Sequence, residues 1–168
     1  IVVEVLRSIP ALLLVFWCAL FIPNVLGGGT SLFMGAAFGL ALHAASYVAE
    51  IVRAGVLAVP RGQFEAAIAS GMTRLQAARF AVLPQALRHT IPAFAACLIS
   101  LFKDTSIIYI IGVVDLTQAG VIVSQRQPDR LVAAYVCMAL GFFVVCRCIA
   151  AAARQLEKRF SMAGYSQS

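Results

Sequence analysis

Residues 8–49 read S-I-P-A-L-L-L-V-F-W-C-A-L-F-I-P-N-V-L-G-G-G-T-S-L-F-M-G-A-A-F-G-L-A-L-H-A-A-S-Y-V-A, and none of these 42 positions carries a charge. A continuous helix of that length would measure roughly 63 Å, against about 30 Å for the hydrocarbon core of a bilayer. Two membrane spans must therefore share the stretch. Pro23-Asn24 and the glycine-rich residues 27–30 are predicted to separate them, because proline and clustered glycine end helices and favour exposed turns.

The composition of the whole chain agrees with a membrane location. The 168 residues are 62% hydrophobic and 12% charged, and the mean hydropathy is +0.94, which is too apolar for an ordinary soluble domain. The sequence predicts an all-α transmembrane helical bundle with spans near 9–25, 32–56, 90–113 and 131–153. Residues 115–130 are polar enough to be an outer loop or a short interfacial helix. The five cysteines lie in apolar segments and are interpreted as small core residues rather than disulfides or metal ligands.

The distribution of basic residues predicts the orientation of these spans. The chain has 13 lysines and arginines and a net charge of +6. With four spans drawn, nine of the basic residues share one side, and only Arg126 and Arg130 lie opposite. The positive-inside rule then puts the loop after the second span and the C-terminus in the cytoplasm, so nucleic acid is not needed to explain the charge. The nine are Arg7, Arg53, Arg61, Arg74, Arg79, Arg88, Arg154, Lys158 and Arg159.

Residues 63–84, called the elbow below, form a substantial polar segment between two very apolar stretches. They read Q-F-E-A-A-I-A-S-G-M-T-R-L-Q-A-A-R-F-A-V-L-P. Gly71 permits a bend, and Thr73 followed by Gln76 has the spacing of a capping box that starts a new helix. Pro84 is expected to end that second helix. The elbow is therefore predicted to consist of two short helices joined at an angle.

The residues of the elbow favour protein docking over catalysis. Phe64, Ile68 and Met72 recur at steps of four and form one apolar stripe on a helix, while neighbouring alanines keep that helix thin. The elbow has no nucleophile, metal-ligand set or pair of carboxylates. The physical alternative is an amphipathic loop lying on the membrane surface, for which the arginines of the segment are also suitable.

The elbow resembles the EAA loop of bacterial ABC importer permeases. Glu65-Ala66-Ala67, Gly71 four residues later and Leu83-Pro84 match the fixed positions of that loop, while Ala81 stands where isoleucine is typical. Further pieces are similar to the polar amino-acid permeases and closest in texture to the glutamate/aspartate type. In chain order they are L-R-S-I-P (6–10), Y-V-A-E-I-V-R-A-G (47–55), G-Q (62–63), L-P-Q-A (83–86), I-P (91–92), K-D-T-S (103–106) and L-E-K-R (156–159).

This resemblance implies a fold and a set of partners. The fold would be that of the MetI-like permeases, with one transmembrane domain over residues 1–168 and the coupling loop at 63–84. Such permeases have five spans and an outer N-terminus, so a first helix is expected upstream of Ile1. The chain would lie in a bacterial inner membrane, in contact with lipid. Expected partners are an ABC ATP-binding subunit, a periplasmic solute-binding protein and a second permease copy or paralogue.

The resemblance also assigns a coupling role to six residues. The ATP-binding subunit would contact Glu65, Ala66, Ala67, Gly71, Leu83 and Pro84. No G-x-x-x-x-G-K-[ST] motif occurs in the chain, so ATP would be bound and hydrolysed by another subunit. The chain itself is predicted to be non-catalytic, without a cofactor or metal.

Lys103 and Asp104 are the candidate solute contacts, because charges deep in an apolar span are costly unless they face protein or water. A polar amino acid carries an ammonium and a carboxylate, which Lys103, Asp104 and the hydroxyls of Thr105 and Ser106 could complement. The alternative is a structural ion-pair network that fixes the helix register. For the whole chain the alternatives are an ion-coupled secondary transporter, in which these charges would bind protons or ions, and a membrane scaffold subunit.

Three features of the second span have predominantly structural interpretations. Gly35 and Gly39 have the G-x-x-x-G spacing of close helix packing, which is expected to be ordinary packing within one bundle. Glu50 and Arg53 can pair along one helical face, for which a structural role is favoured over a role in gating. His43 is a lone histidine, for which a packed and hydrogen-bonded role is favoured over that of a ligand.

Overall fold

The computed structural model describes residues 1–26 and 31–162, which contain helices and no strand. Three helical runs are long and apolar enough to cross a bilayer, and the bent pair α1 and α2 makes a fourth if it is counted as one span. The α-helices are α1 Val2–Ser8, α2 Ala11–Leu26, α3 Leu32–Leu57, α4 Arg61–Ala69, α5 Arg74–Gln76, α6 Leu83–Asp104, α7 Leu116–Arg126 and α8 Leu131–Met162. A π-helical segment, Ala77–Val82, joins α5 to α6, and 3₁₀ segments occupy Thr105–Ile111 and Pro128–Arg130.

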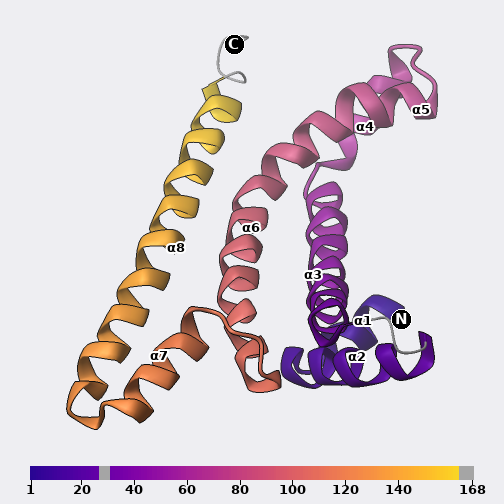
Figure 1. Ribbon diagram of the computed structural model, residues 1–168. Helices are drawn as coiled ribbons and strands as arrows, with labels where there is room; N and C mark the ends of the chain where they lie inside the picture. Colours follow the sequence, from indigo (N-terminus) through magenta and orange to yellow (C-terminus); the bar gives the residue numbers. More distant parts are fainter. Residues whose placement is uncertain (27–30, 163–168) are drawn as a thin grey trace.

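The long helices form an open bundle with distinct ends. α6 lies between α3 and α8 and packs against both (Figure 1). α4, α5 and the C-terminal end of α8 lie at one end of the molecule, whereas α2 and α7 lie at the other (Figure 1). The elbow and the end of the last helix are therefore on the same side of the bundle.

The tightest packing is between α2 and α3. A Cβ atom on Gly35 would lie 2.7 Å from the Cα of Ala19, and one on Gly39 would lie 2.9 Å from the Cα of Val15. Small residues allow such close approach of helix backbones in lipid, where no hydrophobic force drives association. The predicted packing role of this glycine pair is confirmed. The surrounding core contains Val15, Ala19, Ala36, Leu40 and Ile108.

The first predicted span differs from the structure. α2 has 16 residues, or roughly 24 Å of helix, and α1 precedes it at an angle of 102°. The prediction that Pro23-Asn24 breaks the chain is wrong, because both lie inside α2. Pro23 removes only one backbone hydrogen-bond donor from α2. The side-chain amide of Asn24 donates to the Leu20 carbonyl at 2.6 Å, and this added hydrogen bond helps to keep the last turn of α2 helical. The remainder of the predicted break, 27–30, lies outside the described residues.

The third span also begins earlier than predicted. A single helical run extends over Arg74–Ile111, so the expected start near Thr90 is wrong and Pro92 lies inside α6 rather than in a first turn. Pro84 does not end the second helix of the elbow. A π-helical segment precedes Pro84, and in it the Leu83 N–H donates to the Ala78 carbonyl. Because this turn is wider than an α-helical turn, the helix continues through Pro84 although proline has no N–H to donate.

The other two predicted spans match the structure more closely. α3 coincides with the second predicted span, and α8 begins as predicted at Leu131 but continues to Met162. The polar segment between the third and fourth spans contains the short helix α7, one of the two predicted alternatives. α7 packs along α8, where Gly120 lies against Met138.

The cysteines are free thiols, but they are not all core residues. Cys18 is buried, and Cys97 and Cys146 are half-buried. Cys137 and Cys148 on α8 are exposed, so the prediction of a core position is wrong for these two. α8 packs against α6 and α7, but most of its residues from Leu131 to Glu157 are exposed.

Candidate coupling elbow and solute site

The bend of the elbow is fixed by the way α4 ends. Gly71 adopts a φ of +87°, in the left-handed region that favours glycine. The Met72 N–H donates to the Ala67 carbonyl at 3.2 Å, and the Gly71 N–H donates to the Ile68 carbonyl at 2.9 Å. These two bonds form a Schellman motif, which satisfies the last carbonyls of the helix. The sequence placed the bend correctly, and backbone hydrogen bonding makes it rigid.

A capping box starts the next helix, as predicted. The Gln76 N–H donates to the Thr73 hydroxyl oxygen at 3.3 Å, and the Thr73 N–H donates to the side-chain oxygen of Gln76 at 2.9 Å. Both ends of the bend at residues 70–73 are therefore closed by local hydrogen bonds. The predicted pair of short helices is only half right, because the second helix continues into α6.

Two alanines hold the halves of the elbow together. Ala67 in α4 and Ala77 in the π-helical segment are buried, and these two segments pack against each other. Gln85 also donates to the side-chain oxygen of Gln63, at 3.4 Å. Small side chains allow α4 to lie close to the following helix, so larger side chains at these two positions would force the segments apart.

The outer surface of the elbow is exposed and partly apolar. Glu65 and Ala66 face outward, as do Ile68 and Met72 of the predicted apolar stripe. Leu75 at the tip is 78% exposed and Phe80 is 64% exposed. Single exposed apolar residues are common, but several on one short projecting segment are typical of a surface that another molecule covers.

A pocket lies where the elbow meets the third helix. It has a volume of about 350 Å³, and Glu65, which the sequence singled out, is one of its lining residues. Its lining residues are Val56, Leu57, Val59, Pro60, Arg61, Phe64, Glu65 and Val82.

The four predicted solute contacts do not converge on one point. Lys103 is exposed, while Asp104 lines a pocket of about 110 Å³ between α3 and α6. The Thr105 hydroxyl donates to the Phe102 carbonyl at 2.6 Å, and the Ser106 hydroxyl donates to the Lys103 carbonyl at 2.7 Å. Within residues 1–26 and 31–162, neither Lys103 nor Asp104 forms an ion pair with a described side chain.

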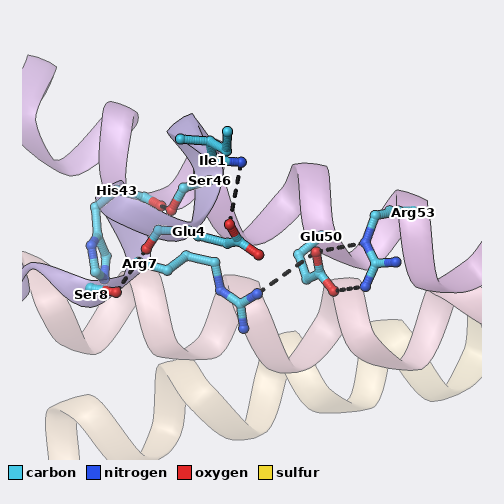
Figure 2. A network of polar contacts seen from close by, with 8 residues as sticks. All are labelled: Ile1, Glu4, Arg7, Ser8, His43, Ser46, Glu50 and Arg53. Carbon is cyan, nitrogen blue, oxygen red and sulfur yellow. Dashed lines mark hydrogen bonds and ion pairs between the residues drawn. The ribbon is translucent and has the colours of Figure 1, made fainter.

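A charged cluster on α3 includes one partner that the sequence did not predict. The predicted pairing of Glu50 with Arg53 is confirmed, with nitrogen–oxygen distances of 2.9 and 2.5 Å. Arg7 of α1 reaches the same carboxylate, with 3.8 Å between its Nη1 and Glu50 Oε2 (Figure 2). The Arg7 guanidinium carbon also lies 5.1 Å from the ring centre of Tyr47. The cluster thus ties the first helix to the third, a contact that sequence periodicity cannot show because the two are distant in the chain.

Three helical runs are long and apolar enough to cross a bilayer, and the chain bends at Gly71 between the first two of them. This is the architecture of a polytopic membrane protein. The chain belongs to the family of binding-protein-dependent transport system inner membrane components, whose model matches residues 1–162. It is therefore a multipass inner-membrane protein, and the resemblance seen in the elbow is confirmed.

The relatives of this chain are amino-acid permeases. It is 34% identical to the inner membrane amino-acid ABC transporter permease YhdY of Escherichia coli K12, over 96% of this chain and 45% of that protein. It is 32% identical to the probable glutamine permease GlnP of Bacillus subtilis, over 95% of this chain and 73% of that protein. It is 34% identical to the glutamate/aspartate import permease GltK of Escherichia coli O157:H7, over 77% of this chain and 61% of that protein.

Solved structures agree with the fold. A crystal structure of an amino acid ABC transporter with histidines superposes with a TM-score of 0.82 at 31% identity, covering 94% of this chain and 73% of that one. The MetNI methionine ABC transporter, in an inward-facing conformation, superposes with a TM-score of 0.78 at 25% identity, and the match covers 94% of this chain and 72% of that one. The predicted MetI-like fold is confirmed. The chain spans less than half the length of YhdY.

Proposed function

We propose that this chain is the solute-conducting membrane subunit of an ATP-driven importer of polar amino acids. Residues 1–168 would form a single transmembrane domain, and the elbow would receive the movement of a separate ATP-binding subunit. The observation that carries this proposal is the match to a binding-protein-dependent transport family together with relatives that are amino-acid permeases. The further partners are a periplasmic solute-binding protein and a second permease copy or paralogue.

The geometry of the elbow supports a mechanical role. A Schellman motif and a capping box fix its bend, and the helix after the bend continues without interruption to Ile111. A force applied at Leu75 or Glu65 would therefore move the third membrane span as a rigid body, which is how hinge-type domain transitions are transmitted. ATP would be hydrolysed by the partner subunit, because the chain has no phosphate-binding loop.

Each of the six coupling residues has a physical part in this proposal. Glu65 and Ala66 are exposed and would contact the ATP-binding subunit, while Ala67 is buried and keeps the two halves of the elbow close. Gly71 permits the bend. Leu83-Pro84 would mark the point at which the elbow passes into α6.

The orientation follows from charge and from the shape of the bundle. The elbow and the C-terminal end of α8 lie at the same end (Figure 1). Five basic residues fall in these two segments, Arg74, Arg79, Arg154, Lys158 and Arg159, against two, Arg126 and Arg130, in residues 115–130 at the other end. We place this end in the cytoplasm, because cytoplasmic loops carry the excess of lysine and arginine. α7 and α2 then lie near the periplasmic side.

We place the solute beside the end of α6, at residues 103–106. Asp104 would bind a positive group of the solute from its pocket, and Lys103 would bind a carboxylate on the open side of the helix. The hydroxyls of Thr105 and Ser106 donate to helix carbonyls, but each oxygen still has acceptor capacity for the solute.

The coupling role is tested by charge reversal on the elbow. Glu65→Arg should reduce co-purification of the ATP-binding subunit by about tenfold or more, because reversal of an interface charge leaves its partner unpaired. Asp129→Arg, an equal change at an exposed position on the opposite end, is the matched control and should leave the complex intact. Unchanged ATPase association and transport in Glu65→Arg would contradict the proposal.

A further inference from the structure

A groove of about 330 Å³ lies between α7 and α8, at the end of the bundle opposite the elbow (Figure 1). Gly120 and Met138 are buried and form its floor, where Met138 takes up the space that a side chain on Gly120 would need. The walls are apolar, and Leu116 and Val123 on them are 48% and 45% exposed. The lining residues are Leu116, Ala119, Gly120, Val123, Arg130, Ala133, Ala134, Cys137 and Met138.

The groove starts where the chain enters the bilayer. α7 has 11 residues, or roughly 16 Å of helix, and is too short to cross a hydrocarbon core of about 30 Å. The run Pro128–Glu157, which contains α8, is long and apolar enough to cross. The turn at 127–130 that joins the two helices therefore lies near the membrane surface, at the level of lipid headgroups. From this turn the groove follows α8 toward the hydrocarbon core.

Two arginines belong to the end of the groove where the helices are joined. Arg130 is a lining residue, and Arg126 lies one turn after Val123 on the same face of α7. Asp129 is close in sequence, but it forms no ion pair with either arginine in the part of the chain that the structure describes. The guanidinium groups are therefore available to an anion, and arginine matches the oxygens of a phosphate group with paired N–H donors.

The groove thus combines a basic end at the membrane surface with apolar walls. A free anion would satisfy the arginines but would leave the exposed side chains of Leu116 and Val123 uncovered. A phospholipid covers both, because its phosphate meets the arginines while an acyl chain lies along the walls. A lipid with a net negative charge fits better than a zwitterionic one, whose own cation lies beside the phosphate and is repelled by the arginines.

We propose that the groove binds one anionic phospholipid, with its phosphate at Arg126 and Arg130 and an acyl chain between α7 and α8. The site goes beyond the proposed transport function and does not depend on which solute is carried. The bound lipid would link α7 to α8, and it would cover apolar side chains that the protein leaves exposed.

Two cysteines on α8 provide the test and its internal control. Cys137 is exposed and lines the groove, whereas Cys148 is exposed on the same helix outside it. The protein as isolated from the membrane in detergent is treated with a maleimide, and the labelling rate of each thiol is followed by peptide mass spectrometry. Short-chain phosphatidylglycerol should slow the labelling of Cys137 by about fivefold or more, the loss expected when a bound chain covers the thiol, and leave Cys148 unchanged.

The choice of probe separates the headgroup from the acyl chain. Phosphatidylcholine with the same chains should need about a tenfold higher concentration for half-maximal protection, because it has no net negative charge. Glycerol phosphate carries the phosphate without acyl chains and should not protect Cys137. Equal protection by phosphatidylcholine and phosphatidylglycerol would overturn the proposal, as would equal protection of the two cysteines.

Substitution of the arginines tests the basic end of the groove. Arg126→Gln combined with Arg130→Gln should raise the concentration of phosphatidylglycerol for half-maximal protection by about tenfold or more, since each basic residue contributes about fivefold. Arg88→Gln combined with Arg154→Gln is the matched control, because it removes the same charge at exposed positions that do not line the groove. Equal protection in the two double variants would overturn the proposal.

A change of shape tests the apolar walls. Ala133→Leu narrows the groove and should reduce protection by phosphatidylglycerol, measured as the ratio of Cys137 labelling rates with and without lipid. Ala139→Leu makes the same change at an exposed position on α8 outside the groove and should behave like the unmodified protein. Protection of Cys137 by the solute-binding protein but not by phosphatidylglycerol would overturn the proposal and assign the groove to that protein. A Cys137 that resists labelling without added lipid would also overturn it, because another subunit would then cover the groove.

Discussion

At the scale of single residues, the positive φ of Gly71 determines the shape of the elbow. A side chain at this position would lie in open space, so the obstacle to substitution is backbone strain and not a clash. The left-handed conformation costs a residue with a Cβ about 1 kcal/mol or more. The same conformation carries the Schellman bonds to Ala67 and Ile68. The angle between α4 and the next helix therefore depends on one glycine.

Gly71→Ala should weaken ATPase association more than it affects folding. The strain of about 1 kcal/mol is small for the whole domain but is concentrated at the bend, where it would shift the exposed face of α4. The measurement is the amount of ATP-binding subunit that co-purifies. Gly62→Ala is the matched control, because that glycine, inside α4, also has open space around it but an ordinary φ. Equal association of the two variants would contradict the importance of the bend.

Residue patterns predicted the bend and its cap but not the pocket between α3 and α6. Gly71 and the Thr73–Gln76 pair are local signals that need no tertiary information. The pocket joins His43 with Asp104, which are distant in sequence, and no periodicity links them. The only available signal was a polar histidine on a membrane helix, which is more often a packed residue.

At the scale of helices, the contact between α2 and α3 depends on the absence of side chains at Gly35 and Gly39. A Cβ on Gly39 would approach the backbone of α2 to within 3.1 Å at the Leu14 carbonyl. Backbone atoms cannot move aside as the end of a flexible side chain can. The two helices would therefore have to separate if either glycine were enlarged.

Gly39→Leu should lower the thermal stability of the purified protein in detergent. Overpacking of this kind costs about 1–3 kcal/mol, and the melting temperature should fall accordingly. Ala41→Leu, on an exposed face of the same helix, adds similar bulk without approaching α2 and should melt close to the unmodified protein. A fall of equal size in both variants would show that the α2–α3 contact is not the cause.

Helix identity was more predictable than helix ends. Long apolar stretches predicted α3 and α8, because twenty or so apolar residues admit few structures other than a membrane span. Proline misled the prediction at Pro23, Pro84 and Pro92. The loss of one donor is tolerated in each case, and a π-helical segment precedes Pro84. These compensations depend on neighbouring geometry that the sequence does not reveal.

At the scale of the whole molecule, the two ends of the bundle should face opposite sides of the membrane. This is tested by cysteine labelling in a variant whose five native cysteines are replaced by alanine. An impermeant maleimide added to spheroplasts should label Gln127→Cys directly and Ser70→Cys only after lysis, because these exposed positions lie at opposite ends. Labelling of Ser70→Cys in intact spheroplasts would reverse the proposed orientation.

The central claim is that ATP hydrolysis by a partner subunit drives transport of a polar amino acid through this chain. The most direct measurement is uptake of radiolabelled glutamate or glutamine by proteoliposomes that contain the complete importer and its solute-binding protein. Uptake should require ATP and the ATP-binding subunit, and it should persist when an ionophore dissipates the ion gradients. Uptake that continues without ATP but stops with the ionophore would contradict the account and identify an ion-coupled secondary transporter.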